Sequence, residues 1–250
     1  MKKAVFIALI VFPLLVCAFE ASSFNLKFPS NLDDWQKTVS INHRFYGEVT
    51  DEPLDNFFGM DAGANVQVNF RMHFPYDSEL SVDYTRKAKE KRIGLAKTFL
   101  FEDFPINSAL DISYHTFKLI SQKEENRKNF VYAISFQNEP ILDRFIFTLN
   151  MGYDAYFERG IYGLGLAAEI SDNLFFITEF FPVLDRADAS GKLSQYIGKE
   201  DVFAFGVKLD TYGHHFKFQL SNSTEFGLRR NSLGSPVDFL MFGFNLERRF

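Results

Sequence analysis

The chain lacks the features that define several large classes of protein. Cys17 is the only cysteine among 250 residues, so no disulfide can form within the chain. Beyond residue 18 no apolar run reaches the roughly 20 residues of a transmembrane helix. Positive charge is not in excess, and a formal net charge of -5 argues against nucleic-acid binding. Cysteine clusters, phosphate-binding glycine loops and internal repeats are also missing, so no metal or cofactor is predicted.

Aromatic residues are abundant instead. Phenylalanine occurs 32 times and aromatics make up 17% of the chain, yet the mean hydropathy is only -0.11. The apolar residues are dispersed by alternation with polar ones, as in strands that place one face in lipid and the other in water.

The first residues predict export. Lys2 and Lys3 precede an apolar run over residues 4–16, and Val16-Cys17-Ala18 fits cleavage after Ala18. We therefore expect a Sec signal peptide at 1–18, a periplasmic lead-in at 19–37 with a short helix near 32–37, and a barrel over 38–250. A lipoprotein anchored through Cys17 is the alternative, although Val16 is larger than the residue that lipidation favours at this position.

The last residues predict a strand with one apolar face. Phe242, Phe244, Leu246 and the terminal Phe250 alternate with Gly243, Asn245, Glu247 and Arg249. Such an ending is typical of outer-membrane β-barrels, so these four apolar residues are interpreted as the signal read by the barrel assembly machinery.

The same period of two recurs along the chain, most clearly in residues 64–74. The pattern predicts twelve strands, at 38–49, 64–74, 80–85, 91–101, 108–117, 130–138, 143–153, 160–170, 174–181, 202–210, 214–221 and 237–250. An even number of strands returns both termini of the chain to the same side of the membrane.

The links between these strands alternate in length. The short ones are 75–79, 102–107, 139–142, 171–173 and 211–213, whereas 118–129 and 182–201 are long and polar, and 88–90 is an exception. Short periplasmic turns and longer outer loops are expected of a membrane barrel.

A soluble lipocalin-like barrel would show similar alternation with its apolar face inward. The signal peptide, the terminal Phe, the even strand number and the links favour the membrane.

Four blocks carry a resemblance to a known family: residues 41–47, 56–66, 213–223 and 242–250. The chain resembles a family of bacterial outer-membrane β-barrel proteins of unknown function. The resemblance implies an all-β, antiparallel, up-and-down transmembrane barrel and brings no established activity. Tyr46 interrupts the family's His-Arg-Phe-Gly pattern and Tyr212 precedes Gly213, so the resemblance leaves the strand register open at these places.

If the apolar faces contact lipid, the opposite faces line the lumen. The residues expected there are Arg44, Arg71, His73, Asp83, Asp111, His115, Glu169, Glu179, Lys208, Asp210, His215, Lys217 and Glu247. Charged rings tune which solutes pass a pore, so we predict a narrow porin-like channel for a small-molecule solute. The alternative is an interior closed by ion pairs, as in a structural barrel that partners envelope components. Outer-membrane lipid and lipopolysaccharide are the expected surroundings.

An outer-membrane lipid hydrolase is a further alternative. It would need a serine, a histidine base and an orienting polar group, and the candidate bases are His43, His73, His115, His214 and His215. No Gly-x-Ser-x-Gly signature accompanies them, so we predict no enzyme. His214 and His215 are adjacent and would point to opposite faces of a strand, which disfavours a shared metal ion.

Overall fold

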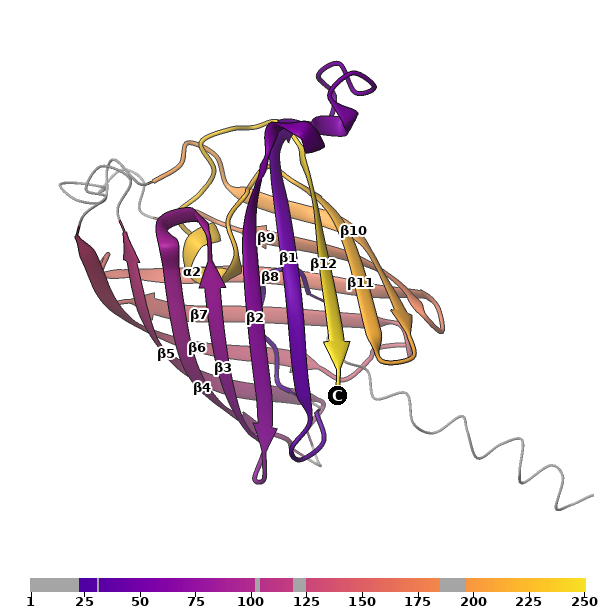
Figure 1. The fold of residues 1–250 in the computed structure, drawn as a ribbon. Helices are drawn as coiled ribbons and strands as arrows, with labels where there is room; N and C mark the ends of the chain where they lie inside the picture. Colours follow the sequence, from indigo (N-terminus) through magenta and orange to yellow (C-terminus); the bar gives the residue numbers. More distant parts are fainter. Residues whose placement is uncertain (1–22, 31, 102–103, 119–124, 185–196) are drawn as a thin grey trace, which may run out of the picture.

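The computed structural model describes residues 23–30, 32–101, 104–118, 125–184 and 197–250. Twelve strands form a closed barrel in which β1 pairs with both β2 and β12 (Figure 1). They are β1 (Lys37–Glu48), β2 (Ala64–Phe74), β3 (Ser78–Thr85), β4 (Glu90–Phe99), β5 (Ile106–Lys118), β6 (Asn126–Asn138), β7 (Phe145–Asp154), β8 (Arg159–Ser171), β9 (Leu174–Phe181), β10 (Val202–Thr211), β11 (His214–Ser221) and β12 (Met241–Arg249). The predicted all-β, antiparallel, up-and-down barrel is confirmed.

The predicted strands match the observed ones closely. The ranges 64–74, 174–181 and 214–221 agree with β2, β9 and β11 residue for residue. The last strand begins at Met241 rather than at residue 237, because the preceding residues belong to a long link. β1 and β12 change register between Arg44 and Glu48, which is where Tyr46 interrupts the family pattern.

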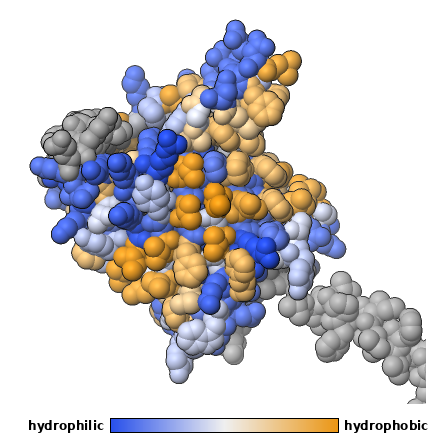
Figure 2. Space-filling view, viewed as in Figure 1, coloured by the Kyte–Doolittle hydropathy of each residue, from blue (hydrophilic) through white to orange (hydrophobic). Residues whose placement is uncertain are grey.

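The apolar faces of the strands point outward. In β12, Phe242, Phe244 and Leu246 lie on the outer face, while Gly243, Asn245 and Glu247 are buried inside. Exposed apolar side chains surround the barrel, including Val39, Ile41, Val68, Val82, Ile93, Leu95, Leu110, Ile112, Phe147, Leu164, Phe176, Phe203 and Phe218. Figure 2 shows hydrophobic side chains gathered across the middle of one face. A soluble barrel with its charges outside is therefore the wrong alternative.

The links define two ends of the barrel. The short-turn end carries the links β2–β3, β4–β5, β6–β7, β8–β9 and β10–β11, together with the start of β1 and the terminal Phe250. The long-link end carries the 3₁₀ segments η2 (Phe57–Ala62) and η3 (Lys87–Lys89) and the short helix α2 (Gly227–Asn231). No helix in the described part of the chain is long and apolar enough to cross a membrane. The predicted signal peptide, Cys17 and parts of the links at 119–124 and 185–196 lie outside the described residues.

The predicted lead-in at 19–37 differs from the structure in two ways. Residues 23–30 lie inside the barrel, where Ser23 to Leu26 and Ser30 are buried, rather than in front of it. The predicted helix near 32–37 is wrong, because only a turn forms at residues 34–35. Trp35 and Gln36 instead pair through their backbones with His73 at the end of β2.

Neighbouring positions on β2 test which face meets lipid. Val68 is 45% exposed on the outer face, whereas Asn69 points inward and donates to Asp83. We expect Val68→Arg to destabilise the inserted barrel by roughly 2–4 kcal/mol if this position lies near the bilayer midplane, and Asn69→Arg to be tolerated. Heat-modifiable gel migration after refolding into bilayers measures the folded fraction. Equal tolerance of the two arginines would contradict the assignment of the faces.

Candidate functional site: the lumen

Two parts of the chain outside the strands fill much of the lumen. The first is the N-terminal segment, residues 23–30, which we call the N-segment. The second is the β11–β12 link, residues 222–240, which carries α2. Residues 222–224 and 231–235 of this link are buried, as are Leu228 and Arg229 on α2. Much of the lumen is therefore a packed interior.

Glu179 holds the N-segment in place. Its carboxylate accepts hydrogen bonds from the backbone N–H groups of Phe24 (2.7 Å), Asn25 (3.0 Å) and Leu26 (3.2 Å). The side-chain amide of Asn25 donates to the same carboxylate at 3.1 Å. Glu179 is 1% exposed. The four donors replace the hydrogen bonds to water that its carboxylate loses on burial.

Two further hydrogen bonds fix the N-segment against β7. Asn150 accepts from the Lys27 N–H at 2.7 Å and donates to the Lys27 carbonyl at 2.7 Å. The Lys27 ammonium forms an ion pair with Asp111 on β5. Hydrogen bonds and charge thus hold the segment on two sides of the barrel.

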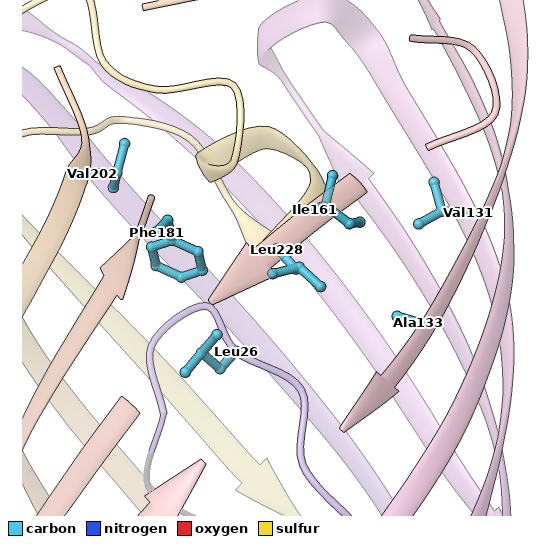
Figure 3. Close-up of a cluster of buried hydrophobic side chains, with 7 residues drawn as sticks. All are labelled: Leu26, Val131, Ala133, Ile161, Phe181, Val202 and Leu228. Carbon is cyan, nitrogen blue, oxygen red and sulfur yellow. The ribbon is translucent and has the colours of Figure 1, made fainter. Parts of the chain in front are cut away.

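The N-segment packs on an apolar wall formed by the inward faces of β6 to β10. Leu26 belongs to a buried cluster with Val131, Ala133, Ile161, Phe181, Val202 and Leu228 of α2 (Figure 3). Phe24 belongs to a second cluster with Ile146, Ala167, Phe175, Ile177 and Ala204. Gly163 and Gly165 make room for Leu26, because a Cβ at either position would lie 2.5–2.6 Å from its methyl groups.

Arg229 anchors α2 at the long-link end. Its guanidinium donates to Asp154 at 2.7 Å and to Glu90 at 3.0 Å, and it lies over the ring of Phe117 at 4.3 Å. Arg230 donates to the other Glu90 oxygen at 2.6 Å. A buried guanidinium needs fixed partners to replace its hydration. Removing one partner of a buried ion pair therefore destabilises the fold.

The link around α2 is also attached to β2 and to the β3–β4 link. Asn65 donates to the Thr224 carbonyl at 2.8 Å, and Lys87 pairs with Glu225 at 2.6 Å. Phe226 lies under the Arg44 guanidinium at 4.7 Å. These contacts place α2 over the lumen.

A cavity of about 220 Å³ remains between the N-segment, the segment around α2 and the inward faces of β1 to β6, β11 and β12. Arg92 lines this cavity and donates to Asp83 at 2.7 Å, Ser81 at 2.7 Å and Asp111 at 2.8 Å. The lining extends from Glu79, near the short-turn end of β3, to Glu90, at the long-link end of β4. The cavity therefore follows most of the length of the strands.

Two further ion clusters lie toward the short-turn end. Arg71 pairs with Glu79 at 3.6 Å and with Glu247 at 3.5 Å, which links β2, β3 and β12. Asp210 pairs with Lys208 at 2.8 Å and with His215 at 2.5 Å. Both clusters cross strand boundaries, so they stabilise the barrel in addition to lining it.

The residues predicted to line the lumen lie on inward faces. Arg44, His73, Asp83, Asp111, His115, Glu179, Lys208, His215, Lys217 and Glu247 are buried, and Arg71, Glu169 and Asp210 are partly exposed. Glu169 lies near the end of β8, apart from the other charges. Of the predicted set, Arg71, Asp83, Asp111, His115, Lys217 and Glu247 meet at the cavity.

Several lumen residues were missed by the sequence analysis. Lys27, Arg229 and Arg230 lie outside every predicted strand. No alternation of apolar and polar residues there indicates which side chains point inward. Arg92 and Glu90 lie at the start of β4, whose apolar positions alternate only from Ile93 onward. Asp154 ends β7 one residue beyond the predicted strand. No signal in the sequence placed the N-segment inside the barrel.

The five histidines are divided between the two faces of the barrel wall. His43 lies on the outer face and stacks on Phe244 at 4.7 Å, and His214 stacks on Phe216 at 6.2 Å. His73, His115 and His215 face inward. His214 and His215 point to opposite faces as predicted, and no group of three or more metal-ligating side chains occurs within the described ranges.

Comparisons with known proteins give a family match and several similar solved structures. A family model described as a membrane bound beta barrel domain (DUF5777) matches residues 31–250. No curated protein matches the sequence. Among solved structures, the KdgM porin is similar, with 8% identity over 85% of this chain and 98% of its own and a TM-score of 0.49. The NanC porin has 6% identity over 84% and 97% with a TM-score of 0.49. LpxR from Salmonella typhimurium has 13% identity over 86% and 99% with a TM-score of 0.48.

Glu179 offers a test of how the N-segment is held. In Glu179→Ala the N–H groups of Phe24, Asn25 and Leu26 lose their acceptor in an apolar surrounding, which should weaken docking by roughly 2–5 kcal/mol. Hydrogen exchange of a peptide covering residues 23–30 should become faster in the folded barrel. Glu169→Ala, on the neighbouring strand β8, is the matched control and should leave this exchange unchanged. Unaltered protection in Glu179→Ala would contradict the assigned role.

Proposed function

This chain belongs to the family of membrane-bound β-barrel domains, and we propose that it acts in the outer membrane as a narrow channel of weak charge selectivity for small polar solutes. The observation that carries the proposal is the polar cavity along β1 to β6, lined by charged, amide and hydroxyl side chains. A channel of this kind needs a continuous polar lining that replaces the water around a solute.

The charges of the cavity are balanced. The cationic residues that line it are Lys27, Arg71, Arg92, Lys217, Arg229 and Arg230, and the acidic residues are Glu79, Asp83, Glu90, Asp111, Glu225 and Glu247. Arg92 lies between Asp83 and Asp111, and Arg71 lies between Glu79 and Glu247. Paired charges cancel much of each other's field, so neither cations nor anions are strongly preferred. Uncharged or zwitterionic polar solutes suit such a lining.

One cluster of charges joins three parts of the cavity lining. Arg92 and Lys27 both contact Asp111, and the three side chains come from β4, the N-segment and β5. A solute that passes along the strands must cross this cluster. We therefore propose that Arg92 and Asp111 set the remaining selectivity.

The second candidate is a closed scaffolding barrel. The N-segment and α2 favour this candidate, because buried hydrogen bonds and ion pairs at Glu179 and Arg229 hold them inside the barrel. In this case the cavity would be an internal void and the barrel would act through partners at its outer links. Conductance distinguishes the two candidates.

Insertion is proposed to depend on the last strand. Phe242, Phe244 and Leu246 form an apolar outer face on β12, and Phe250 is 65% exposed at the end of the chain. We propose that the assembly machinery reads this face before β12 pairs with β1. Lipid and lipopolysaccharide would then surround the exposed apolar belt.

Single-channel recording in planar bilayers tests the channel. We expect small stepwise currents and a reversal potential near zero in a potassium chloride gradient. Arg92→Gln removes the central cation and leaves Asp83 and Asp111 in excess, so the reversal potential should shift toward cation selectivity. Lys91→Gln is the matched control, because Lys91 is the exposed neighbour on the outer face of β4.

The control variant should match the unmodified protein in conductance and selectivity. A folded barrel that inserts but carries no current would support the scaffolding candidate and contradict the channel. Identical selectivity in Arg92→Gln and Lys91→Gln would exclude Arg92 from the path of the ions.

A further inference from the structure

Three polar side chains form a continuous hydrogen-bonded chain inside the lumen. The Ser113 hydroxyl lies 3.0 Å from Nε2 of His115, and Nδ1 of His115 lies 2.8 Å from Oε1 of Glu90. Ser113 and His115 are two residues apart on β5 and share its inward face, while Glu90 begins β4. All three are buried, with exposed fractions of 2%, 5% and 8% in the same order.

The partners determine the proton positions. The ionised carboxylate of Glu90 can only accept, so the neutral imidazole donates from Nδ1. Nε2 then carries the lone pair and accepts the hydroxyl proton of Ser113. This is the order of nucleophile, base and orienting acid found in serine hydrolases, which are recognised by geometry rather than by sequence position.

Two other inward serines are bonded differently. The hydroxyl of Ser135 donates to the Ala109 carbonyl at 3.5 Å, and that of Ser221 donates to the Phe203 carbonyl at 2.7 Å. These contacts hold a hydroxyl against the barrel wall and do not activate it. Ser113 differs because its partner can remove the proton.

The surroundings supply space and positive charge. Ser113, His115 and Glu90 all line the cavity of about 220 Å³. The Arg92 guanidinium occupies the space that a side chain on Gly94 would fill, and Gly94 pairs with Ser113 across β4 and β5. Arg229 contacts the same Glu90 oxygen as His115. Among the described residues, the Nη2 atoms of Arg229 and Arg230 are buried without a hydrogen-bond partner.

We propose that Ser113 and His115 are catalytic residues of an esterase site inside the lumen, with Glu90 as the positioning residue. His115 Nε2 takes the proton as Ser113 Oγ bonds to the carbonyl carbon of an ester, and the guanidinium groups stabilise the oxyanion that forms. The carbon–alkoxy bond then breaks, and the alcohol leaves with the proton from His115. His115 then takes a proton from water as the water oxygen bonds to the acyl carbon. The bond from that carbon to Ser113 Oγ breaks and Oγ takes the proton from His115, which releases the acid and restores Ser113.

The cavity defines the substrate class. Its volume of about 220 Å³ and its charged lining suit a small polar ester rather than a long acyl chain. Lipid substrates would also have to leave the membrane and enter the lumen. The proposed activity is compatible with a channel, because the site lies at the wall of the proposed solute path, and it does not depend on conduction.

A fluorophosphonate probe tests the nucleophile in the full-length folded barrel. We expect covalent labelling at Ser113, located by mass spectrometry, and none in Ser113→Ala. His115→Gln should slow the labelling by roughly 10²-fold or more, the contribution of a general base. Ser135→Ala is the matched control, since it removes another buried hydroxyl that lines the same cavity, and it should be labelled like the unmodified protein.

Hydrolysis of p-nitrophenyl acetate tests turnover and the role of Glu90. Ser113→Ala should lose the activity, and Glu90→Gln should lower kcat by roughly 10²-fold or more, whatever the change in KM. Loosening of α2 alone would change access and therefore KM. Heat-modifiable migration verifies folding of each variant. Absence of labelling at Ser113 in the folded protein, or equal labelling in His115→Gln, would overturn the proposal.

Discussion

The hydrogen-bonded closure of β1 on β12 is the constraint on which the rest of the structure depends. Lipid offers no partner for a backbone N–H or C=O group, so a sheet can lie in a membrane only when its edges pair with each other. Closure gives each strand an outer face in lipid and an inner face away from it. Val68 and Asn69 show the result, because two neighbours on β2 meet opposite surroundings. The polar residues therefore gather inside, where they must satisfy one another.

The interior meets this requirement in two different ways. On the side of β6 to β10 the wall is largely apolar, and Leu26 of the N-segment covers it. Glu179 is a charged group on this wall, and backbone N–H groups satisfy its carboxylate. On the side of β1 to β5 the wall is charged, and pairs such as Arg92 with Asp111 neutralise it. The cavity remains on the charged side, where a packed apolar filling would leave these groups without partners.

Glu90 connects the two proposals. Its carboxylate binds Arg229 and Arg230 of α2 and also orients His115. The same carboxylate thus fixes α2 beside the cavity and completes the proposed triad with Ser113 and His115. A small polar molecule that enters along the strands would pass a wall where a nucleophile and cationic groups face it. Transport and ester hydrolysis would then use one cavity, and movement of α2 would affect both.

Sequence alone determined the strands, their number and which faces are apolar, because alternation with a period of two is a local property that survives in any barrel. Residues 64–74 and 174–181 became β2 and β9 without change, and Ser113 and His115 share a face for the same reason. Only the tertiary structure decided that Leu26 and Arg229 lie inside, since neither belongs to an alternating segment. It also decided that Glu90 meets His115, because that contact depends on the register of β4 against β5 and on the direction of two side chains. Contacts between residues far apart in the chain leave no periodic pattern in the sequence. The packing inside the lumen therefore followed only from the tertiary structure.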